Sequence, residues 1–406
     1  MGEIKFRDIK FIQEKDKVKL VFLRIYYSYI DNLELERIGD FKADGGNILF
    51  PETDQSALDI KFNELLNDAF SRLTNKITKK PTIYIHKNSG IPLIGNDAFG
   101  IVDRGTNIIE IKLNTGCNLD CIYCSVDNSK RDVDFVVEKD YIVEELKKII
   151  EYKDDDNIEI HISTQGEPLL YSPIVELVRD ISQIKEVKVF SIDTNATLLS
   201  EKLIDDLVDA GMTRFNISIN SFDQNLARKL SCKEEYDVER IKKLAKYAAE
   251  RSYVIIAPVM MRDINENEMQ EMIEFAKTIS KNHKKPIIGI QNYLEYKFGK
   301  KPTKQYSWKE FEFILKKLED KHGIKLLYDF KVDFNLHPTK ELIKPFKKGN
   351  ITEGAVKCVG RKKNEVIAVS EDRNITVKGD IGKLKDKKVR IKITRSKHNI
   401  FYGMIV

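Results

Sequence analysis

Between about residue 108 and residue 291, short runs of aliphatic and β-branched residues alternate with longer amphipathic stretches. This alternation is typical of repeated βα units around a parallel sheet. It predicts six strands, at residues 108–114, 158–163, 187–194, 214–220, 253–260 and 286–291. Helices are predicted between them at 139–152, 173–182, 201–210, 238–251 and 265–281. The central part of the chain is therefore expected to be an α/β domain built from six βα units.

Three of the predicted strands have one apolar and one polar face, because successive side chains of a strand point in opposite directions. The polar faces carry Glu110, Lys112, Asn114, Glu159, His161, Ser163, Asn216, Ser218 and Asn220. Parallel strands that are buried on both faces are usually continuous hydrophobic runs. The polar faces therefore predict a barrel lumen that holds a polar ligand, and a single water-exposed face is the alternative.

The flanking regions have different patterns. Residues 1–105 contain strand-like pieces at 17–29, a helical stretch at 58–73 and a turn-rich segment at 84–92, which predicts an N-terminal α+β extension of unassigned function. Residues 301–352 predict a helical connector whose helix at 307–322 carries the only tryptophan, Trp308, expected to be a packing residue. Residues 353–406 contain short alternating strands that predict a small all-β barrel, since closure removes exposed edges.

Length and composition limit the class of protein. A chain of 406 residues with 42% hydrophobic and 33% charged residues is expected to form two or three globular domains. It contains no apolar run of about 20 residues, the length that spans a membrane, so no membrane partner is expected. The start of the chain lacks the apolar core of a signal peptide, and several of its five cysteines are needed in reduced form, which predicts a cytoplasmic location.

Charge is distributed unevenly along the chain. Residues 346–406 hold 16 Lys or Arg and 6 Asp or Glu, a net charge of 16 − 6 = +10, so the whole-chain value of +5 leaves 5 − 10 = −5 for residues 1–345. A basic module of this kind is typical of a surface that binds polyanions. A solvated, lysine-rich face has the same composition, and charge alone does not separate the two interpretations.

Three cysteines follow the first predicted strand with the spacing CxxxCxxC, at Cys117, Cys121 and Cys124. Three thiolates within eight residues can bind one soft metal centre. Closed zinc and iron-sulfur sites normally have four ligands, so three leave one position open for chemistry. A zinc site with three cysteines and a histidine is the competing interpretation.

The cysteine spacing, with Tyr123 before the last cysteine, resembles the cluster loop of radical S-adenosylmethionine (SAM) enzymes. That resemblance implies a partial (βα)6 barrel and a [4Fe-4S] cluster whose unligated iron chelates SAM. In the family, one electron from the reduced cluster cleaves SAM to methionine and a 5′-deoxyadenosyl radical. The resemblance therefore also implies a reducing electron donor as a partner.

Further motifs at the ends of the predicted strands match the same family. Residues 165–168, Gln-Gly-Glu-Pro, resemble its Gly-Gly-Glu-Pro motif, which implies that Gly166 and Glu167 bind the SAM amino group, although Gln165 departs from the pattern. By the same resemblance Ser218 would bond the methionyl carboxylate, Asn220 a ribose hydroxyl, and Tyr123 would lie against the adenine. Asn195 belongs to a run similar to the family's Thr-Asn-Gly. Simple packing is the alternative for Tyr123, and a loop cap is the alternative for Asn195.

The basic tail resembles a TRAM domain, a compact RNA-binding barrel at the C-terminus of several RNA-modifying enzymes. The resemblance is carried by the turn at residues 379–383 followed by a basic strand. It implies RNA, most readily tRNA, as the partner of this domain.

The whole pattern favours a radical SAM enzyme that modifies a nucleoside in RNA, by methylation or a related carbon-centred change. Methylthiotransferases of the family bind a second cluster through cysteines ahead of the first, whereas Cys117 is the first cysteine here. Cys358 and Cys232 are candidate catalytic residues, by similarity to methylases with a carrier and a resolving cysteine, and inert core residues are the alternative. Two alternatives remain open. The protein could be a radical SAM enzyme that acts on a protein or small molecule, or a non-catalytic iron-sulfur protein that binds RNA.

Overall fold

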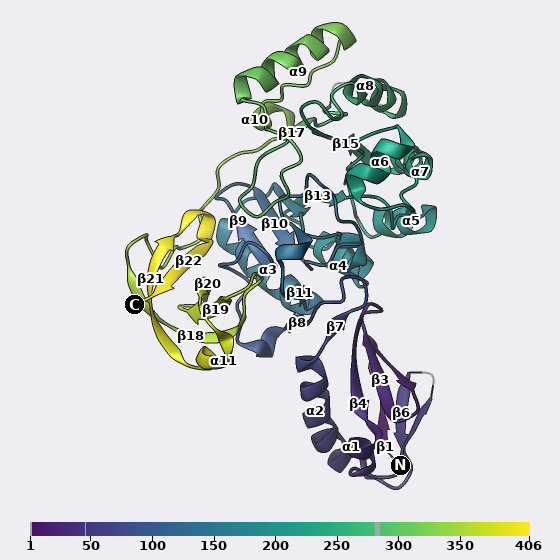
Figure 1. Ribbon diagram of the computed structural model, residues 1–406, viewed down its shortest axis with the longest axis vertical. Coiled ribbons are helices and arrows are strands. Elements are labelled where there is room, and N and C mark those ends of the chain that lie inside the picture. Colours follow the sequence, from purple (N-terminus) through teal and green to yellow (C-terminus); the bar gives the residue numbers. More distant parts are fainter. Residues whose placement is uncertain (1, 45, 281–284) are drawn as a thin grey trace.

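The computed structural model describes residues 2–44, 46–280 and 285–406 (Figure 1). Its centre is a six-stranded sheet of order β15-β14-β13-β12-β10-β9. The strands are β9 (Gly100–Asp103), β10 (Ile108–Lys112), β12 (Ile158–Ile162), β13 (Val187–Thr194), β14 (Arg214–Ile217) and β15 (Tyr253–Ile256). Neighbours from β10 to β15 are parallel, and β9 is antiparallel to β10. The parallel strands begin where the sequence predicts five of its six strands to begin.

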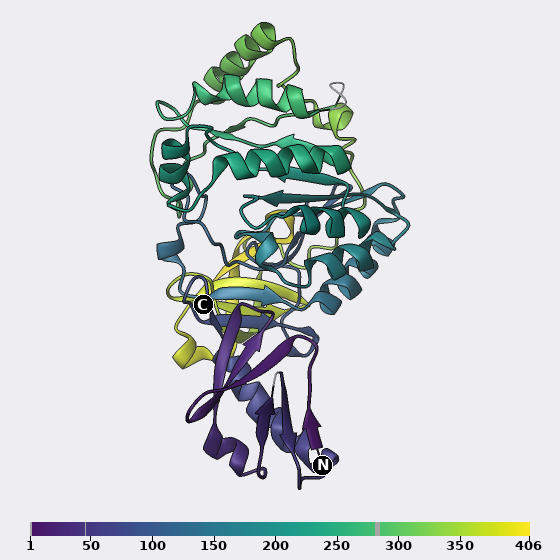
Figure 2. The ribbon, with the colours of Figure 1, turned by 90° about the vertical axis from the view of Figure 1, so that its right-hand side faces the viewer.

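Amphipathic helices cover the apolar face of this sheet, and Figure 2 shows them stacked along one side of it. They are α3 (Lys139–Lys153), α4 (Ile174–Ser182), α5 (Glu201–Asp209), α6 (Gln224–Ser231), α7 (Val238–Arg251) and α8 (Glu268–Ile279). In α3 the buried residues Ile142, Leu146 and Ile150 recur every four positions, which places them on one stripe. Ser200 and Asp237 accept backbone hydrogen bonds at the starts of α5 and α7, as N-cap residues do. The predicted end of the last of these helices, Lys281, lies outside the described residues.

The sixth predicted strand, at 286–291, is not a continuous strand. Ile288 forms a single parallel bridge with Ile256, and β17 (Gln291–Asn292) pairs with β16 (Val259–Met260) in a separate two-stranded sheet. The fifth predicted strand, at 253–260, is likewise divided into β15 and β16. Proline explains both differences, because Pro258 and Pro286 have no N–H to donate to a ladder.

The polar faces predicted for the strands exist, and their side chains bond to one another. Glu159 accepts hydrogen bonds from Ser191 Oγ at 2.8 Å and forms a buried ion pair with Arg214. His161 lies 3.1 Å from Asp193, a pairing that raises the pKa of the imidazole against the opposing effect of its burial. The side chain of Asp193 is still 47% exposed. The sheet therefore presents a polar, partly open surface on the side away from the helices.

The N-terminal part forms two small sheets around its own core (purple in Figure 1). One has the order β1-β6-β5 and the other β2-β3-β4-β7. Their strands are β1 (Gly2–Ile4), β2 (Ile9–Gln13), β3 (Lys17–Phe22), β4 (Tyr26–Asp31), β5 (Lys42–Asp44), β6 (Asn47–Phe50) and β7 (Thr74–Asn75), with helices α1 (Asn32–Glu36) and α2 (Gln55–Ser71). Phe11 and Phe62 meet edge to face with ring centroids 5.8 Å apart. Apolar faces of the sheets thus pack on α2, as the α+β expectation requires.

The expected boundary at residue 105 does not coincide with a break in the structure. β9 precedes it and yet pairs with β10, and β8 (Thr82–Ile85) pairs in parallel with β11 (Asp134–Val137). Both pairings were missed because short strands with two buried faces show no alternation. The N-terminal region is therefore joined to the core by backbone hydrogen bonds.

The connector contains α9 (Trp308–His322) and α10 (Phe330–Asp333) at the far end of the molecule (Figure 1). Helix α9 begins with a capping box between Ser307 and Glu310. Trp308 is 59% exposed and meets Phe311 edge to face, so the expected packing role is only partly met.

Residues 351–405 form a closed five-stranded barrel of order β18-β19-β20-β22-β21. The strands are β18 (Ile351–Val359), β19 (Glu365–Ser370), β20 (Arg373–Lys378), β21 (Lys388–Arg395) and β22 (Phe401–Ile405), with α11 (Ile381–Leu384) between β20 and β21. β20 and β22 are parallel and the other neighbours are antiparallel. The small barrel predicted from the alternating pattern therefore forms, and it lies beside the central sheet (yellow in Figure 1).

Among the described residues, no helix combines the length and the apolar character that crossing a membrane requires.

Candidate active site

The loop with the three cysteines leaves the end of β10 and is held at its root by a buried carboxylate. Asp134 accepts hydrogen bonds from Thr115 Oγ1 at 3.1 Å, Asn75 Nδ2 at 3.0 Å and Thr78 Oγ1 at 2.5 Å. Arg131 bonds the carbonyl of Thr115 and lies 3.7 Å from Asp134. The N-terminal region thus supplies two of the side chains that fix the start of this loop.

The thiols of Cys117, Cys121 and Cys124 are free and partly buried. Burial raises the pKa of Cys117, and the neighbouring thiols of Cys121 and Cys124 raise it further. Burial also raises the pKa of Cys121 to about 12, against a hydrogen bond from Tyr123 that lowers it. Thiols this difficult to ionise require a bound cation to become thiolates, and iron supplies such charge. The donor set is therefore suited to a soft metal centre.

Within the described part of the chain, no three His, Cys, Asp or Glu side chains converge closely enough for one metal ion. A zinc ion bound at about 2.3 Å from each sulfur would require the three thiols to move together.

The predicted turn at Gln165–Pro168 packs directly on the cysteine loop. Glu167 N donates to the carbonyl of Gly116 at 2.9 Å. A Cβ added to Gly166 would lie 2.1 Å from that same carbonyl oxygen, so only glycine allows the two segments to approach this closely. The retained glycine of the motif is thereby explained by contact with the residue before Cys117.

Glu167 is a buried carboxylate that the protein leaves without a cation. It accepts hydrogen bonds from Thr194 Oγ1 at 2.6 Å, Asn195 N at 2.9 Å and Leu169 N at 3.1 Å. Burial nevertheless raises the pKa of Glu167 to about 7. No ion pair to Glu167 is present among residues 2–44, 46–280 and 285–406. An ammonium group would compensate this charge, so the site fits the amino group of SAM.

Asn195 connects this turn to the cysteine loop. Its Nδ2 donates to Asn118 Oδ1 at 3.1 Å, and Asn118 Nδ2 donates to Thr197 Oγ1 at 2.8 Å. The Oδ1 of Asn195 accepts a hydrogen bond from the backbone N of Thr197 at 3.0 Å, as a loop cap does. The side chain therefore acts as a cap and as a link to the residue after Cys117, while contact of Asn195 with a cofactor stays a prediction.

Tyr123 and Asn220 contact each other at the carboxyl end of the central sheet. Asn220 Nδ2 donates to the Tyr123 hydroxyl at 2.7 Å, and Asn220 Oδ1 accepts from Val259 N at 2.7 Å. Tyr123 packs with Met261 and Tyr293, which gives it the packing role named as the alternative. Ser218 lies just beyond β14 and is partly buried, with its backbone N bonded to Thr194. The structure thus brings the predicted positions to one end of the sheet.

The two remaining cysteines have different surroundings. Cys232 is exposed at the end of α6, where Ser231 and Leu230 accept backbone hydrogen bonds from the cysteine loop. Cys358 lies within β18, and it packs against the main hydrophobic core. Burial raises the pKa of Cys358 to about 12, which suits the inert interpretation.

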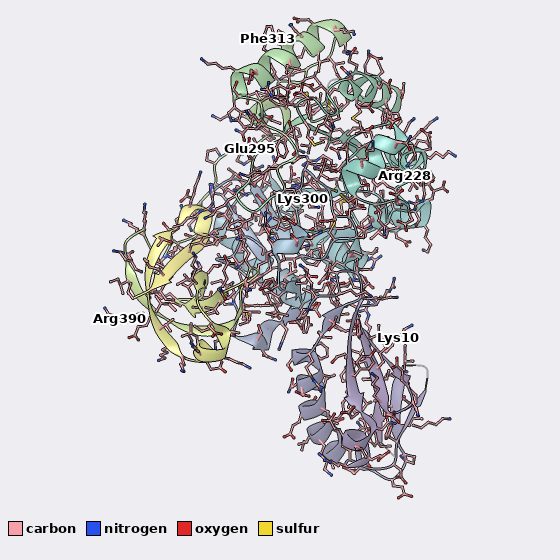
Figure 3. All side chains as sticks on the ribbon, in the orientation of Figure 1. Lys10, Arg228, Glu295, Lys300, Phe313 and Arg390 are labelled. Atoms are coloured by element: carbon pink, nitrogen blue, oxygen red, sulfur yellow. The ribbon has the colours of Figure 1, made fainter. Side chains whose placement is uncertain are left out.

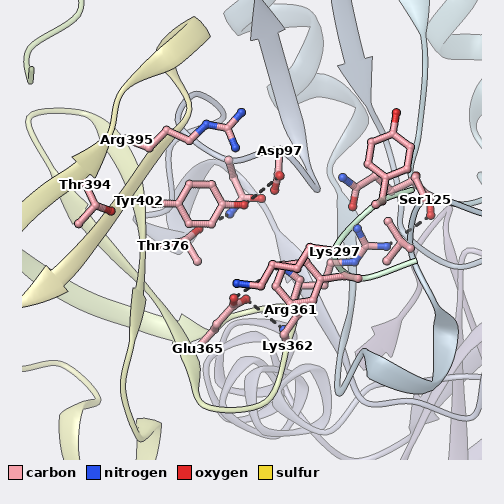
Figure 4. A pocket seen from close by; sticks show the side chains of 15 residues that line it. Asp97, Ser125, Lys297, Arg361, Lys362, Glu365, Thr376, Thr394, Arg395 and Tyr402 are labelled. Carbon is pink, nitrogen blue, oxygen red and sulfur yellow. Dashed lines mark hydrogen bonds and ion pairs between the residues drawn. The ribbon is translucent and has the colours of Figure 1, made fainter. Parts of the chain in front are cut away.

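A pocket of about 600 Å³ opens between the cysteine loop and the C-terminal barrel (Figure 4). Its walls come from the end of the cysteine loop, from the segment after β17, and from the C-terminal barrel. The lining residues used below are Ser125, Gln165, Tyr296, Phe298, Arg361 and Lys362. A volume of this size lies within the usual range of about 300–1,000 Å³ for small-molecule sites.

Several residues at this site were missed by sequence reasoning. Thr194 and Asn118 position the carboxylate and the loop, and Asn265 Nδ2 donates to the carbonyl of Asn220 at 2.8 Å. Arg361 is 6% exposed and lines the pocket from the turn between β18 and β19. Thr194 carried a signal, since it ends a predicted strand next to Asn195, but nothing local to Arg361 indicates burial against another domain.

Sequence comparison defines the class of protein to which this fold and site belong. The model of the radical SAM superfamily matches residues 111–276, which include the three cysteines and the glutamate turn. Over 99% of its length the chain is 35% identical to the uncharacterized protein MJ0103 of Methanocaldococcus jannaschii and covers 98% of that protein. Residues 111–276 are therefore a radical SAM domain, and the chain as a whole belongs to one family with MJ0103.

Other relatives match only part of the chain. GTP 3′,8-cyclase of Listeria monocytogenes is 38% identical over 127 residues, which are 31% of this chain and 36% of that protein. The probable GTP 3′,8-cyclase of Pyrococcus abyssi is 29% identical over 55% of this chain and 67% of its own length. The chain thus spans between about a third and two thirds of these cyclases.

Solved structures overlap partially with the fold. SuiB of Streptococcus suis bound to the precursor peptide SuiA is 17% identical, with a TM-score of 0.44 over 80% of this chain and 71% of that one. A spore photoproduct lyase mutant with a dinucleoside photoproduct is 15% identical, with a TM-score of 0.43 over 61% of this chain and 80% of that one. The assignment to the superfamily rests on the sequence matches.

The cofactors are those of the superfamily, a [4Fe-4S] cluster and SAM. Cys117, Cys121 and Cys124 are the residues that would hold the cluster, and the cluster supplies the electron for reductive cleavage of SAM. This membership also sets aside the single zinc ion as the occupant of the three thiols.

Proposed function

We propose that this protein is a radical SAM enzyme that modifies a nucleoside in RNA, most readily tRNA, by methylation or a related carbon-centred change. The observation that carries the proposal is the placement of the C-terminal barrel. Its β18–β19 turn reaches the cysteine loop, where Asp132 N donates to the carbonyl of Arg361 at 3.0 Å. A molecule bound along the barrel would therefore pass beside the residues that hold the cofactors.

The connectivity of the C-terminal barrel supports an oligonucleotide as its ligand. A closed five-stranded barrel whose third and fifth strands are parallel, with a helix between the third and fourth, has the strand order of an OB-fold. OB-folds bind oligonucleotides through the face of strands 2 and 3 and the loops after strands 1 and 4. Here the first of those loops and residues of β19 and β20 line the pocket, as do Thr394 and Arg395 at the end of β21.

Charge on the barrel supports the same ligand. Along β21 the side chains of Lys388, Arg390 and Lys392 alternate with buried residues and are exposed. Figure 3 places Arg390 at the outer edge of the barrel, away from the central sheet. Such a row of cations matches the spacing and sign of a phosphate backbone.

The residues around the cofactor site have separable tasks under this proposal. Glu167 would hold the SAM ammonium group, while Thr194 and Asn195 keep its carboxylate oriented by the bonds described above. Asn118 and Asp134 would fix the loop so that the three thiols stay in place. A reducing protein or small molecule must supply the electron, and it is a proposed partner.

A free nucleotide is the second candidate substrate. The relatives named GTP 3′,8-cyclase align with up to 55% of this chain, and their name specifies a guanine nucleotide as substrate. The pocket beside the cysteine loop combines aromatic and basic side chains, which also suits a nucleotide. The C-terminal barrel, with the strand order of an OB-fold, favours RNA over a free nucleotide.

The test is a comparison of modified nucleosides by mass spectrometry in RNA from cells with and without the gene. Loss of one modified nucleoside on deletion, restored by the wild-type gene and not by Cys121→Ser, is the expected result. An unchanged nucleoside profile contradicts the RNA proposal. Separately, 5′-deoxyadenosine should form after anaerobic reduction with SAM, and its absence would favour a non-catalytic iron-sulfur protein.

A further inference from the structure

The pocket contains a buried arginine whose hydrogen-bonding capacity is not used by the protein. Arg361 is 6% exposed, and its Nε has no hydrogen-bond partner. Among the described residues its side chain forms a single hydrogen bond, a long one of 3.4 Å from one terminal nitrogen to the carbonyl of Gln165. Gln165 Oε1 lines the same pocket and is also buried without a partner. Buried polar groups are normally bonded, so these two atoms mark a place where a ligand is expected.

Positive charge accumulates behind this position. Arg131 is 3% exposed, and its Nε and one terminal nitrogen are likewise without partners. Lys80 bonds the carbonyls of Asn128 and Arg131 on the other side. Asp134 forms an ion pair with Arg131 at 3.7 Å, and Asp97 accepts a hydrogen bond from Tyr402 at 2.9 Å, so within the described part of the chain neither carboxylate forms an ion pair with Arg361. Buried cations of like sign destabilise a fold unless an anion joins them.

We propose that Arg361, supported by Arg131, binds a phosphate group of the substrate in this pocket. The planar guanidinium can donate two parallel hydrogen bonds to phosphate oxygens, which a lysine cannot do. Gln165 then has a buried acceptor available for a hydroxyl of the same ligand. This assignment explains why glutamine replaces the glycine that the family motif has at this position, because glycine offers no side-chain acceptor.

The rest of the pocket defines the ligand as a phosphorylated nucleoside. Tyr296 is 46% exposed at the rim and presents a surface on which a base can stack. Ser125, which directly follows Cys124, also lines the pocket. A nucleoside whose phosphate is bound at Arg361 therefore lies beside the cysteine loop. This inference rests on the proposed function for its nucleoside, whereas the phosphate site stands on the geometry alone.

The test measures binding of inorganic tripolyphosphate by calorimetry to the full-length, anaerobically reconstituted protein. Arg361→Gln should weaken binding by about tenfold or more, because a charged bidentate contact is lost. The matched control is Arg37→Gln, an exposed arginine at the end of α1 and outside the pocket, which should change affinity by less than about twofold. Equal losses in both variants, or no loss in Arg361→Gln, would overturn the proposal.

Stability without ligand gives a second measurement. In phosphate-free buffer, Arg361→Gln should melt at the same temperature as wild type or higher, because it removes an uncompensated buried charge. Tripolyphosphate should then raise the melting temperature of wild type and not that of the variant. If Arg361→Gln does not fold, Arg361→Lys replaces it in the test, because lysine keeps the positive charge but cannot donate two parallel hydrogen bonds. An unchanged affinity of Arg361→Lys for tripolyphosphate would contradict the phosphate site.

Competition experiments identify the source of the phosphate. Displacement of tripolyphosphate by a tRNA transcript supports the RNA function, and displacement by GTP alone supports the free nucleotide. If SAM affinity falls in Arg361→Gln while tripolyphosphate affinity does not, Arg361 serves the cofactor and the inference is wrong. An unchanged RNA nucleoside profile with intact, Arg361-dependent phosphate binding would refute only the RNA proposal.

Discussion

At the scale of single residues, the site depends on charges that the protein itself does not neutralise. Glu167 is a buried carboxylate supported by three hydrogen-bond donors and by no cation from the described residues, and burial of the Cys117 and Cys121 thiols opposes their ionisation. The ionised form of each of these groups becomes favourable only when a positively charged cofactor group is present. Binding and protonation at this site are therefore coupled.

The pH dependence of SAM binding follows from Glu167. Its pKa is raised to about 7 in the folded protein without ligand, so the carboxyl is largely neutral below that pH and ionised above it. Since the SAM ammonium needs the carboxylate, affinity for SAM should increase as the pH rises from about 6 to about 8. Calorimetric titrations at several pH values check this.

The raised pKa of Glu167 also makes folding stability depend on pH, in the opposite direction to the affinity for SAM. Between the ordinary pKa of 4.5 and about 7, the folded state keeps a proton that the unfolded state has lost, so this group's contribution to stability falls as the pH rises. Glu167→Gln, which carries no titrating proton, should flatten both profiles. A wild-type affinity that is independent of pH across this range would contradict the assignment.

The cysteines should separate into ligands and non-ligands by iron content. Cys121→Ser should abolish the cluster, seen as loss of iron, sulfide and visible absorbance, because a hydroxyl is a poor ligand for iron. Cys358→Ser is the matched control, since Cys358 packs in the core, and it should retain a full complement of iron. Full iron content in Cys121→Ser would remove Cys121 from the ligand set.

At the scale of elements, the sequence predicted strands and helices well wherever the hydrophobic period was long and regular. Five helices of the core and five parallel strands follow directly from their patterns, whereas the short helix α6 was not predicted. The segments that failed are those whose partners lie far away in the sequence. β9 needs β10 on one edge, β8 needs β11, and the division of the predicted strand at 253–260 depends on Pro258. No local period encodes such pairings.

The segment before β9 shows the same limit, because it is shaped by the C-terminal barrel. Asn374 N donates to the carbonyl of Ile94 at 2.9 Å, and Phe401 N donates to the carbonyl of Gly95 at 3.0 Å. Gly95 has a φ of +119°, and a Cβ there would lie 2.3 Å from the carbonyl oxygen of Asn374. The residues that directly follow the predicted turn-rich segment at 84–92 thus form the contact surface for the C-terminal barrel.

Gly95→Ala should therefore destabilise the protein by about 2 kcal/mol or more, from backbone strain together with the clash. Gly323→Ala is the control, because Gly323 has a φ of +65° and no neighbouring atom within 4 Å of an added Cβ. It should cost about 1 kcal/mol, from the left-handed backbone alone. Denaturant unfolding measures both. Equal losses would show that the contact between Gly95 and Asn374 is unimportant.

At the scale of the whole molecule, the motifs that meet at the end of the central sheet could be recognised from sequence, and the pocket beside them could not. The cysteine spacing and the glutamate turn are short motifs whose members lie close together along the chain. The pocket, in contrast, joins residue 125, residue 296 and residue 361 by folding alone. The burial of Arg361 is a property of the interface between domains, so composition shows only that the tail is basic.

The positive charge of the C-terminal barrel leads to a prediction about how tRNA binding depends on salt concentration. Affinity for tRNA should fall linearly on logarithmic axes as salt increases, because bound phosphates release counterions. The triple variant Lys388→Gln, Arg390→Gln, Lys392→Gln should reduce the magnitude of that slope by about 2 to 3, at about 0.9 per lost phosphate contact. Filter binding across a salt series measures it.

A triple variant on the N-terminal sheet, Lys10→Gln, Lys17→Gln, Lys19→Gln, is the matched control, since Figure 3 places Lys10 on a different domain. It should leave the slope unchanged. An identical change in both triple variants would show that only net charge matters.

The bonds of Asp134 have a consequence for how this protein can be taken apart. One carboxylate joins Asn75 and Thr78 from the amino-terminal lobe to Thr115 at the threshold of the cysteines, and Arg131 beside it faces Arg361 from the carboxyl-terminal lobe. A polypeptide trimmed to the catalytic middle would carry every motif of its superfamily. It would still lack both outer supports of its metal-binding loop. The three lobes should therefore be expressed and purified together, and loss of one outer lobe should inactivate the protein.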